Sequence, residues 1–276
     1  MQNRAIRWAT GTWEECSEAA TEVRRKVFGE EMGIDEAIDF DGSDHEATHV
    51  VAFQQQLPVG CGRLQPPEGR IGRMAVLAGF RGRGLGTSIL HRLLREAVRA
   101  GIRTLQLHAQ EHAIDFYRRH GFAPEGLRFL EAGIRHQKMK RQLAWMSAVA
   151  GVVTRDGKVL LGRRAPHVSM GGFWDLFGGK IDPGETELEA LQRELAEEVS
   201  LEVTPGAPLG VIIYDDCQGR GLWRCPVFAV TEWKGEVSTN EEHDEVGWFA
   251  PAEMARLRLA HERLIHLAEQ ALAQDR

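Results

Sequence analysis

Gly179-Lys-Ile-Asp-Pro-Gly-Glu185, followed after seven residues by Arg193-Glu-Leu-Ala-Glu-Glu198, is the stretch that decides the fold of the C-terminal half. Its first part is rich in turn-forming residues, and its second part continues a helical pattern. Apolar residues recur there at helical spacing and form one stripe, made of Leu188, Leu191, Leu195 and Val199. The sequence therefore predicts a glycine turn that runs directly into an amphipathic helix.

Three glutamates lie beside this apolar stripe. Glu194, Glu197 and Glu198 stand at i, i+3 and i+4, so their carboxylates share one side of the helix. Like charges at this spacing repel one another by roughly 0.2–0.5 kcal/mol per pair. Magnesium prefers oxygen ligands and keeps several waters, which leaves room for substrate phosphates. A solvated acidic helix face explains the glutamates alone, but the adjoining glycine turn favours a divalent-cation site.

The complete pattern resembles the Nudix box, G-x5-E-x7-R-E-U-x-E-E-x-G-U, where U is aliphatic. The resemblance covers roughly residues 146–270. It implies hydrolysis of a nucleoside diphosphate linked to another group, with Mg²⁺ or Mn²⁺ as the cofactor. The metal ligands that it implies are the Gly179 carbonyl and the carboxylates of Glu194, Glu197 and Glu198. Arg193 and Glu185 would brace the turn against the helix.

Two features of this half leave alternatives open. Ser200 stands where the Nudix box has glycine, and at a positive φ it would strain the turn by roughly 1–2 kcal/mol. Because no ligand is lost, we expect lower stability rather than lost chemistry. The candidates for the general base are Glu198 and two glutamates of a later loop, Glu241 and Glu242. The loop glutamates fit plain solvated charges equally well.

The substrate is indicated by weaker signals. The segment around Trp174-Asp-Leu-Phe-Gly-Gly179 resembles the MutT-type 8-oxo-dGTP diphosphatases, but Phe177 replaces a proline. Arg163 and Arg164 are candidates for gripping a phosphate or a base, or are ordinary surface arginines. His261 stands where that subgroup reads a purine with asparagine, and imidazole lacks the paired donor and acceptor of an amide. We therefore expect a (d)NTP or modified nucleotide without assigning guanine.

A glycine loop marks the N-terminal half. Arg81-Gly-Arg-Gly-Leu-Gly86 follows the short strand predicted at 73–76 and precedes an amphipathic helix near 89–98. Glycines allow close backbone approach, and the free N–H groups of a helix N-terminus bind pyrophosphate. On its own, such a loop is also compatible with a tight strand-to-helix turn.

A second motif supports a ligand-binding role for this loop. The run Phe116-Tyr-Arg-Arg-His-Gly-Phe122, together with the glycine loop, resembles the GNAT acyltransferases over roughly residues 5–142. The resemblance implies that Tyr117 protonates the departing coenzyme A thiolate. It further implies that acetyl-CoA is held by Met74, Val76, Arg81, Arg83, Gly84, Leu85, Gly86, Thr87 and Ser88. Candidates for the base that deprotonates the acceptor amine are Glu30, Glu31 and His49, although a structural or solvated role fits each of them better.

The chain of 276 residues is long enough for two compact domains. The sequence places a GNAT acyl-CoA N-acyltransferase domain at residues 1–144 and a Nudix hydrolase domain at residues 145–276. The fold class is α/β (α+β), with a GNAT mixed β-sheet flanked by helices followed by a Nudix α/β/α sandwich. The spacing of apolar residues over Pro251–Ala273 predicts one closing helix.

Composition limits the partners and the compartment. A formal net charge of −6 argues against nucleic acid as a partner, and no run of apolar residues is long enough to span a membrane. Four scattered cysteines and the absence of a secretory signal favour reduced thiols in the cytoplasm. The expected partners are a small-molecule amine or peptide N-amine acceptor and a nucleotide, and a homodimer is left open. A rival hypothesis makes only one domain catalytic and the other a ligand-sensing or docking module.

Overall fold

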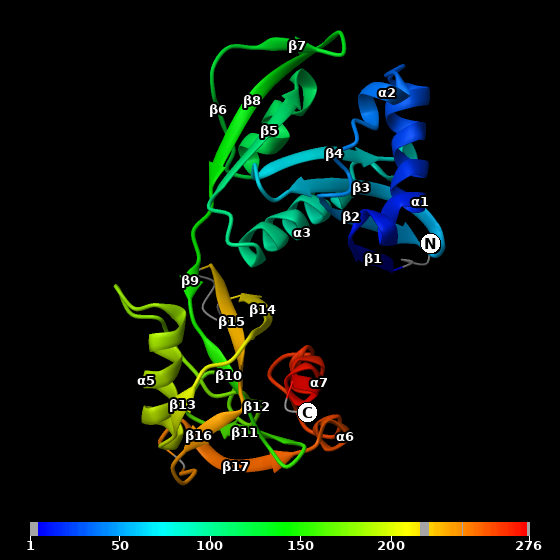
Figure 1. The fold of residues 1–276 in the computed structure, drawn as a ribbon. Helices are drawn as coiled ribbons and strands as arrows, with labels where there is room; N and C mark the ends of the chain where they lie inside the picture. Colours follow the sequence, from blue (N-terminus) through cyan, green and yellow to red (C-terminus); the bar gives the residue numbers. More distant parts are fainter. Residues whose placement is uncertain (1–4, 216–220, 239, 275–276) are drawn as a thin grey trace. The chain divides into compact units, whose positions relative to one another are not determined.

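The computed structural model describes residues 5–215, 221–238 and 240–274 and divides the chain into two compact units, Met1–Leu143 and Ala144–Arg276 (Figure 1). The first unit is a mixed sheet with helices on both faces. Its helices are α1 (Trp13–Arg24), the π-helical turn η1 (Arg25–Glu31), α2 (Glu36–Asp39), the 3-10 turns η2 (Ala78–Phe80) and η3 (Glu111–Ala113), α3 (Leu85–Arg99) and α4 (Ile114–Arg119). Its strands are β1 (Ile6–Gly11), β2 (Thr48–Gln54), β3 (Leu57–Gln65), β4 (Arg70–Val76), β5 (Thr104–Gln110), β6 (Ala123–Pro124), β7 (Phe129–Glu131) and β8 (Ile134–Gln142).

Side chains alternate across β3 and so direct the two main helices to opposite faces of this sheet. Cys61 packs in one cluster with Cys16, Ala20 and Val23 of α1. On the other face, Gly60 and Gly62 leave room for Ile89 and Leu93 of α3, because a Cβ atom on either glycine would crowd those side chains. The strand order is β1-β2-β3-β4-β5-β8-β6, with β7 paired to β8.

The sheet opens between β4 and β5. These strands are parallel, and the pairing between them is limited to Arg70 with Gln106 within the described chain. In β4, the pairing with β3 shifts register between Gly72 and Ala75, and Arg73 adopts a φ of +52°. The extra residue is a β-bulge, which bends a strand and increases its twist. Beyond Arg70 the two strands diverge, and their edges are left to line a cavity.

The second unit is also built on a central sheet. Its strands are β9 (Met146–Ser147), β10 (Ala150–Arg155), β11 (Lys158–Arg164), β12 (Trp174–Asp175), β13 (Glu202–Thr204), β14 (Pro208–Asp215), β15 (Leu222–Val230), β16 (Glu232–Lys234) and β17 (His243–Phe249). Its helices are α5 (Glu187–Val199), α6 (Pro251–Met254) and α7 (Leu264–Gln274). The sheet runs β12-β11-β10-β15-β14, with β17 paired to β11 and β9 to β15, while β13 and β16 form a separate ribbon.

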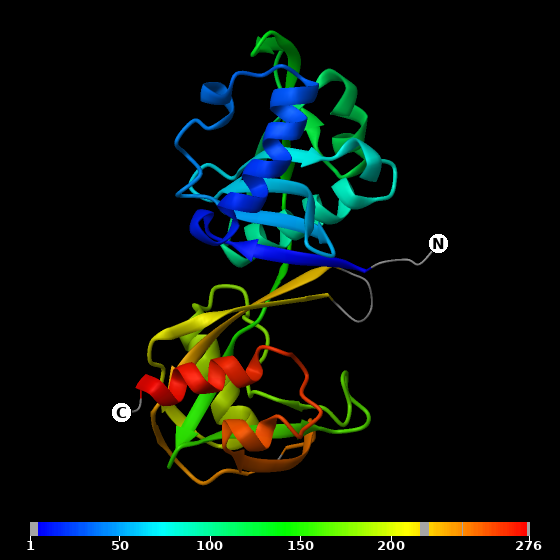
Figure 2. The same ribbon diagram turned by 90° about the vertical axis from the view of Figure 1, so that its right-hand side faces the viewer.

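Two apolar clusters cover the two faces of this second sheet. One joins Leu191 and Leu195 of α5 to Phe177 and Val153, and the other packs Leu267 of α7 against the opposite face. In Figure 2, α7 lies in front of the sheet and α5 behind it. The predicted α/β/α sandwich and the mixed sheet of the first unit are both confirmed.

One predicted element is wrong. The sequence favoured a continuous helix from 251 to 273, but α6 ends at Met254 and α7 begins at Leu264. Between them, the Arg258 carbonyl accepts a hydrogen bond from the Trp174 N–H, and the Ala260 N–H donates to the Trp174 carbonyl. The segment therefore pairs with β12 instead of continuing the helix. Its backbone N–H and C=O groups are hydrogen-bonded to Trp174, a residue distant in the sequence, and not to a helical neighbour.

No helix within the described residues is both long enough and apolar enough to cross a membrane. Three cysteines, Cys16, Cys61 and Cys225, are buried free thiols, and Cys217 lies outside the described residues.

Candidate functional sites

The glutamates of α5 meet the glycine turn that precedes the helix. A capping box between Thr186 and Glu189 fixes the start of α5. The Glu198 carboxylate is buried, with 7% of the residue exposed, and accepts a hydrogen bond of 2.9 Å from the Gly178 N–H. A Cβ atom on Gly179 would overlap the carboxylate of Glu194. The glycine at 179 therefore lets the Glu194 carboxylate lie directly against the turn, and a side chain there would displace it.

These carboxyl groups are held where negative charge is costly. Burial raises the pKa of Glu198 to about 8, and the charges of Glu194 and Glu242 add to this against the hydrogen bond from Gly178. Burial also raises the pKa of Glu194, and the negative charges of Glu197 and Glu242 raise it further, whereas the hydrogen bond from Arg193 acts in the opposite direction. A divalent cation would relieve both the burial and the mutual repulsion. The hard oxygen donors gathered here fit Mg²⁺ or Mn²⁺.

Arg193 balances the charge of this cluster and braces the turn. Its guanidinium donates to both oxygens of Glu185 at 2.8 and 2.9 Å and to the Lys180 carbonyl at 2.9 Å. It also donates to Glu194 at 2.8 Å and to Glu197 at 3.4 Å. Across the described residues, no group of three or more acidic, histidine or cysteine side chains is already closed around a metal position. Arg193 contacts one oxygen of Glu194 and one of Glu197, which leaves the second oxygen of each carboxylate for a cation.

The loop before β17 brings one further carboxylate towards this cluster. The charge of Glu242 acts on both Glu194 and Glu198. The side-chain oxygen of Asn240 accepts hydrogen bonds from the N–H groups of Glu242 and His243, each 3.0 Å long, and so shapes the loop. Of the two loop glutamates predicted as bases, Glu242 is the one whose charge reaches the cluster in these interactions, whereas no such effect is seen for Glu241.

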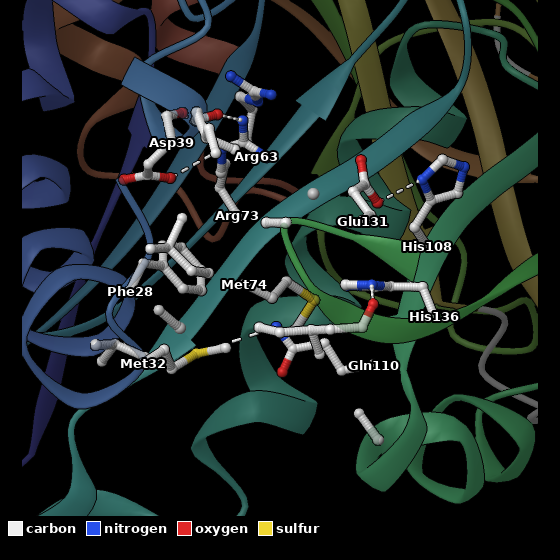
Figure 3. A pocket seen from close by; sticks show the side chains of 18 of the residues that line it. Phe28, Met32, Asp39, Arg63, Arg73, Met74, His108, Gln110, Glu131 and His136 are labelled. Carbon is white, nitrogen blue, oxygen red and sulfur yellow. Dashed lines mark hydrogen bonds and ion pairs between the residues drawn. The ribbon is translucent and has the colours of Figure 1, made fainter. Parts of the chain in front are cut away.

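The first unit contains a cavity of about 900 Å³ where β4 and β5 diverge. Its apolar wall includes Phe28 and Met32, and Figure 3 shows Asp39 and Arg73 towards one end and His108 with Glu131 towards another. Tyr117 also lines it, and its hydroxyl donates to the Met74 sulfur at 3.5 Å. Burial raises the pKa of Tyr117 to about 12, so the phenol stays protonated at neutral pH.

The glycine loop forms the N-terminus of α3. Gly82 and Gly84 have φ values of +73° and +78°, which glycine adopts without strain, and Gly84 is the residue that precedes the helix. The Arg81 guanidinium donates to the Val76 carbonyl at 2.8 Å and to Glu31 at 2.6 Å. Its side chain therefore ties the loop to β4 and η1, whereas the N–H groups at the start of α3 have no intrahelical partners.

Comparison with known proteins assigns both units. The model of the acetyltransferase (GNAT) domain matches residues 14–143, and that of the NUDIX domain matches residues 145–268. An uncharacterised N-acetyltransferase of Bacillus subtilis, YjcF, is 33% identical over 131 residues, which are 46% of this chain and 94% of the relative. A CTP pyrophosphohydrolase of Escherichia coli is 32% identical over 115 residues, 42% of this chain and 83% of the relative. The chain belongs to both families.

A further relative also matches the Nudix domain alone. An 8-oxo-dGTP diphosphatase of Proteus vulgaris is 36% identical over 99 residues, which are 36% of this chain and 87% of the relative. The chain thus carries a GNAT acetyltransferase domain followed by a Nudix pyrophosphohydrolase domain, as the two motifs predicted.

The predicted substrate contacts of the Nudix domain lie in different surroundings. Arg163 is engaged by Asp244 and Glu245, each at 2.8 Å on the surface. Arg164 lies 3.8 Å from Glu242, on the side of the carboxylate cluster. His261 accepts a hydrogen bond from the Arg263 N–H just before α7. Arg164 is therefore the better placed of the two arginines to meet a phosphate.

The predicted acceptor bases of the GNAT domain either have other partners or are missing from the described lining of the cavity. The Glu31 carboxylate is paired with Arg81. His49 is buried beside the Asp44 carbonyl, and burial lowers its pKa. Glu30 is not among the described residues that line the cavity. Sequence reasoning missed the pair His108 and Glu131, although the polar positions of β5 alternate with the buried Leu105, Leu107 and Ala109 and mark the face that meets the cavity.

Proposed function

We propose that the chain is a bifunctional enzyme. The GNAT domain transfers the acetyl group of acetyl-CoA to an amine, which is a small molecule or a peptide N-amine. The Nudix domain hydrolyses the pyrophosphate bond of a (d)NTP or modified nucleotide with Mg²⁺ or Mn²⁺. Relatives named as CTP pyrophosphohydrolase and 8-oxo-dGTP diphosphatase support the nucleotide class.

For hydrolysis, the observation that carries the proposal is the glycine turn packed on α5, where the buried Glu198 meets Gly178 and the partly buried Glu194 meets Gly179. These two carboxylates, Glu197 and the Gly179 carbonyl would hold the ion. The carbonyl already accepts a hydrogen bond from the Val149 N–H and has a second lone pair free for a cation. When bound, the ion neutralises charge on the phosphates and makes water a stronger acid. Glu242 is the residue that we assign to accept the proton of the attacking water, and Arg164 meets a phosphate.

For acetyl transfer, the observation that carries the proposal is Tyr117 on the wall of the cavity between β4 and β5. The N–H groups from Arg83 to Thr87 receive the pyrophosphate, since the predicted Ser88 N–H already donates to the Gly84 carbonyl at 3.0 Å. The β4 edge at Met74 and Val76 receives the pantetheine arm. A phenol whose pKa is about 12 keeps its proton at neutral pH and so has it available to donate as the carbon–sulfur bond breaks. The departing thiolate is then protonated in place, which prevents reversal of the transfer.

The test of hydrolysis is product release from a panel of nucleotides with and without Mg²⁺. The panel contains canonical and oxidised (d)NTPs, CTP, nucleotide sugars and coenzyme A. Glu198→Gln should lower kcat by at least 100-fold, since removal of a metal ligand removes the ion or misplaces it. The control is Glu187→Gln, which removes a carboxylate of the first turn of the same helix that pairs with Arg224 at 2.9 Å and not with the cluster. Metal-independent turnover, or full activity of Glu198→Gln, would contradict the proposal.

The rival hypothesis, in which one domain only senses a ligand, is separated by the same panel combined with an acetyl-transfer assay. Turnover of nucleotides and of acetyl-CoA by the full chain supports two enzymes. If a folded chain binds coenzyme A but transfers no acetyl group to any amine, the GNAT domain is a sensor.

A further inference from the structure

His108 and Glu131 form a hydrogen-bonded pair on the wall of the GNAT cavity. The Nδ1 atom of His108 lies 2.9 Å from a carboxylate oxygen of Glu131 (Figure 3). His108 comes from β5 and Glu131 from β7, and their side chains are 29% and 41% exposed. The imidazole ring packs edge-on against Phe129, with ring centroids 4.8 Å apart. The ring is thus fixed in orientation while it remains accessible from the cavity.

The pair lies beside the point at which the sheet opens. His108 is two residues beyond Gln106, the residue through which β5 pairs with β4. Arg70, the partner of Gln106, places one guanidinium nitrogen 3.3 Å from His108 Nδ1 and 3.6 Å from Glu131. All three residues line the same cavity as Tyr117. His108 and Tyr117 therefore open onto the same cavity.

We propose that His108 is the general base that deprotonates the acceptor in acetyl transfer, with Glu131 as its positioning residue. The acceptor class is a primary alkyl amine, which is protonated at neutral pH and cannot attack until it loses a proton. This inference rests on the acetyl-transfer activity proposed above and names the residue that its mechanism still lacks.

The hydrogen bond to Glu131 sets the tautomer of His108. When Nδ1–H donates to the carboxylate, Nε2 carries the lone pair that accepts a proton. Nε2 has no hydrogen-bond partner within the part of the chain that the structure describes. The Arg70 guanidinium then pairs with the other oxygen of Glu131, because Nδ1 cannot donate to the carboxylate and accept from Arg70 at once. The carboxylate also stabilises the imidazolium that forms after proton transfer.

The protons of the reaction balance with two groups. The ammonium gives one proton to His108 Nε2, and its nitrogen then forms a bond to the acetyl carbon as the carbon–sulfur bond breaks. The thiolate takes the proton of Tyr117. The nitrogen loses its second proton through water, and that proton restores the phenol. His108 returns its proton to solvent, so each transfer releases one amide, one thiol and one proton.

Other histidines of the cavity lack this arrangement. His136 is buried, and its Nδ1 bonds the neutral Ile134 carbonyl, so an imidazolium there would gain no ion pair. His112 has no carboxylate partner among the described residues, and it lies in the exposed turn η3. Of these three histidines, His108 is the one with a carboxylate at hydrogen-bond distance from a ring nitrogen.

The experiment compares two acceptors, 2-phenylethylamine and 4-methoxyaniline, with acetyl-CoA and the full chain at neutral pH. The first is protonated under these conditions and the second is already neutral. His108→Gln should lower kcat/KM for the alkyl amine by at least 100-fold and for the aniline by less than 10-fold. The affinity for coenzyme A, measured by calorimetry, should stay unchanged. The control is His45→Gln, since His45 forms a similar pair with Glu14 outside the cavity.

Glu131→Gln provides a second variant that keeps a hydrogen-bond acceptor but removes the charge. It should lower kcat for the alkyl amine about 10-fold and leave KM for acetyl-CoA unchanged, whereas a purely structural role would weaken both amines and coenzyme A together. Equal losses with the two amines, or wild-type rates for His108→Gln, overturn the assignment of the base. A wild-type protein that acetylates neither amine nor any peptide amine overturns the proposed transfer itself, and this inference with it.

Discussion

Arg24 and Arg25 are adjacent in the sequence, yet their environments are opposite. Arg24 is 1% exposed and binds Asp39 at 3.0 Å and Asp44 at 2.9 Å, whereas Arg25 is 61% exposed and meets Glu36 on the surface. Removing one partner of a buried ion pair leaves an uncompensated charge, while an exposed pair contributes little. The same kind of substitution therefore has very different consequences at two consecutive positions.

We expect Arg24→Ala to lower the free energy of unfolding of the GNAT domain by about 3–5 kcal/mol. Arg25→Ala, the matched control, should lower it by less than about 1 kcal/mol. Urea titration of both variants, followed by circular dichroism, measures the difference. Similar small losses in both would show that Asp39 and Asp44 are satisfied by Arg63 and Arg73 without Arg24.

Asp175 predicts a pH dependence of stability in the Nudix domain. Burial raises its pKa from 3.8 to about 6, against the hydrogen bond from the Leu176 N–H and the charge of Arg164. Between these values the folded state binds more protons than the unfolded state, so stability falls as the pH rises through this window. The loss is on the order of 2–3 kcal/mol above pH 6.

Asp175→Asn should remove the contribution of Asp175 to this dependence and stabilise the Nudix domain at neutral pH relative to the wild type, because an amide oxygen still accepts from the Leu176 N–H, while the contribution of Glu198 stays in both proteins. Thermal unfolding of both proteins between pH 4 and pH 7 tests it. The melting temperature of the variant should exceed that of the wild type by an amount that grows as the pH rises through 4 to 6. A difference that shrinks or changes sign over this range would contradict the prediction.

At the scale of single residues, the sequence alone was enough to predict site residues whose partners are close along the chain. Glu194, Glu197 and Glu198 share a helix, so their spacing alone brings them together. The pair of His108 and Glu131 could not be predicted in this way. His108 is on β5 and Glu131 is on β7, and the two strands come together only because both pair with β8. Ser200 has a φ of +59°, which is the conformation for which backbone strain was expected at this position.

At the scale of the elements, two substitutions in the loop before α3 distinguish the effect of backbone strain on coenzyme A binding from the effect of a negative charge. Gly84 has a φ of +78°, and open space surrounds the position of a Cβ atom. Gly84→Ala should cost about 1–2 kcal/mol through backbone strain alone. Gly84→Glu adds the same strain and places a negative charge beside the N–H groups proposed to receive the pyrophosphate.

Calorimetry with coenzyme A should therefore detect binding by Gly84→Ala and at least a 100-fold weaker affinity for Gly84→Glu. Equal affinities in the two variants would mean that the pyrophosphate lies elsewhere.

The closing helix of the Nudix domain marks the limit of reasoning at this scale. Its apolar spacing is helical, but the pairing of residues 258–260 with Trp174 is a tertiary contact that periodicity cannot reveal.

At the scale of the whole molecule, the motif in each half was enough to predict the fold of that half. This is because each half has a hydrophobic core of its own. The clusters described here draw their buried residues from one unit each, Cys16–Ala75 in the first and Ala148–Ala271 in the second. A unit with its own core can unfold cooperatively by itself.

We therefore expect two thermal transitions in the full chain, of which coenzyme A moves only one. At 100 times its Kd, a ligand stabilises its domain by about 2.7 kcal/mol, which raises the melting temperature by roughly 10 °C for a domain of this size. Arg24→Ala should lower the same transition that coenzyme A raises, and Asp175→Asn should move only the other. Differential scanning calorimetry of the three proteins makes the comparison. A single transition that shifts as a whole with coenzyme A would mean that the two cores unfold as one cooperative unit, and the stability of each domain would then depend on ligands of the other.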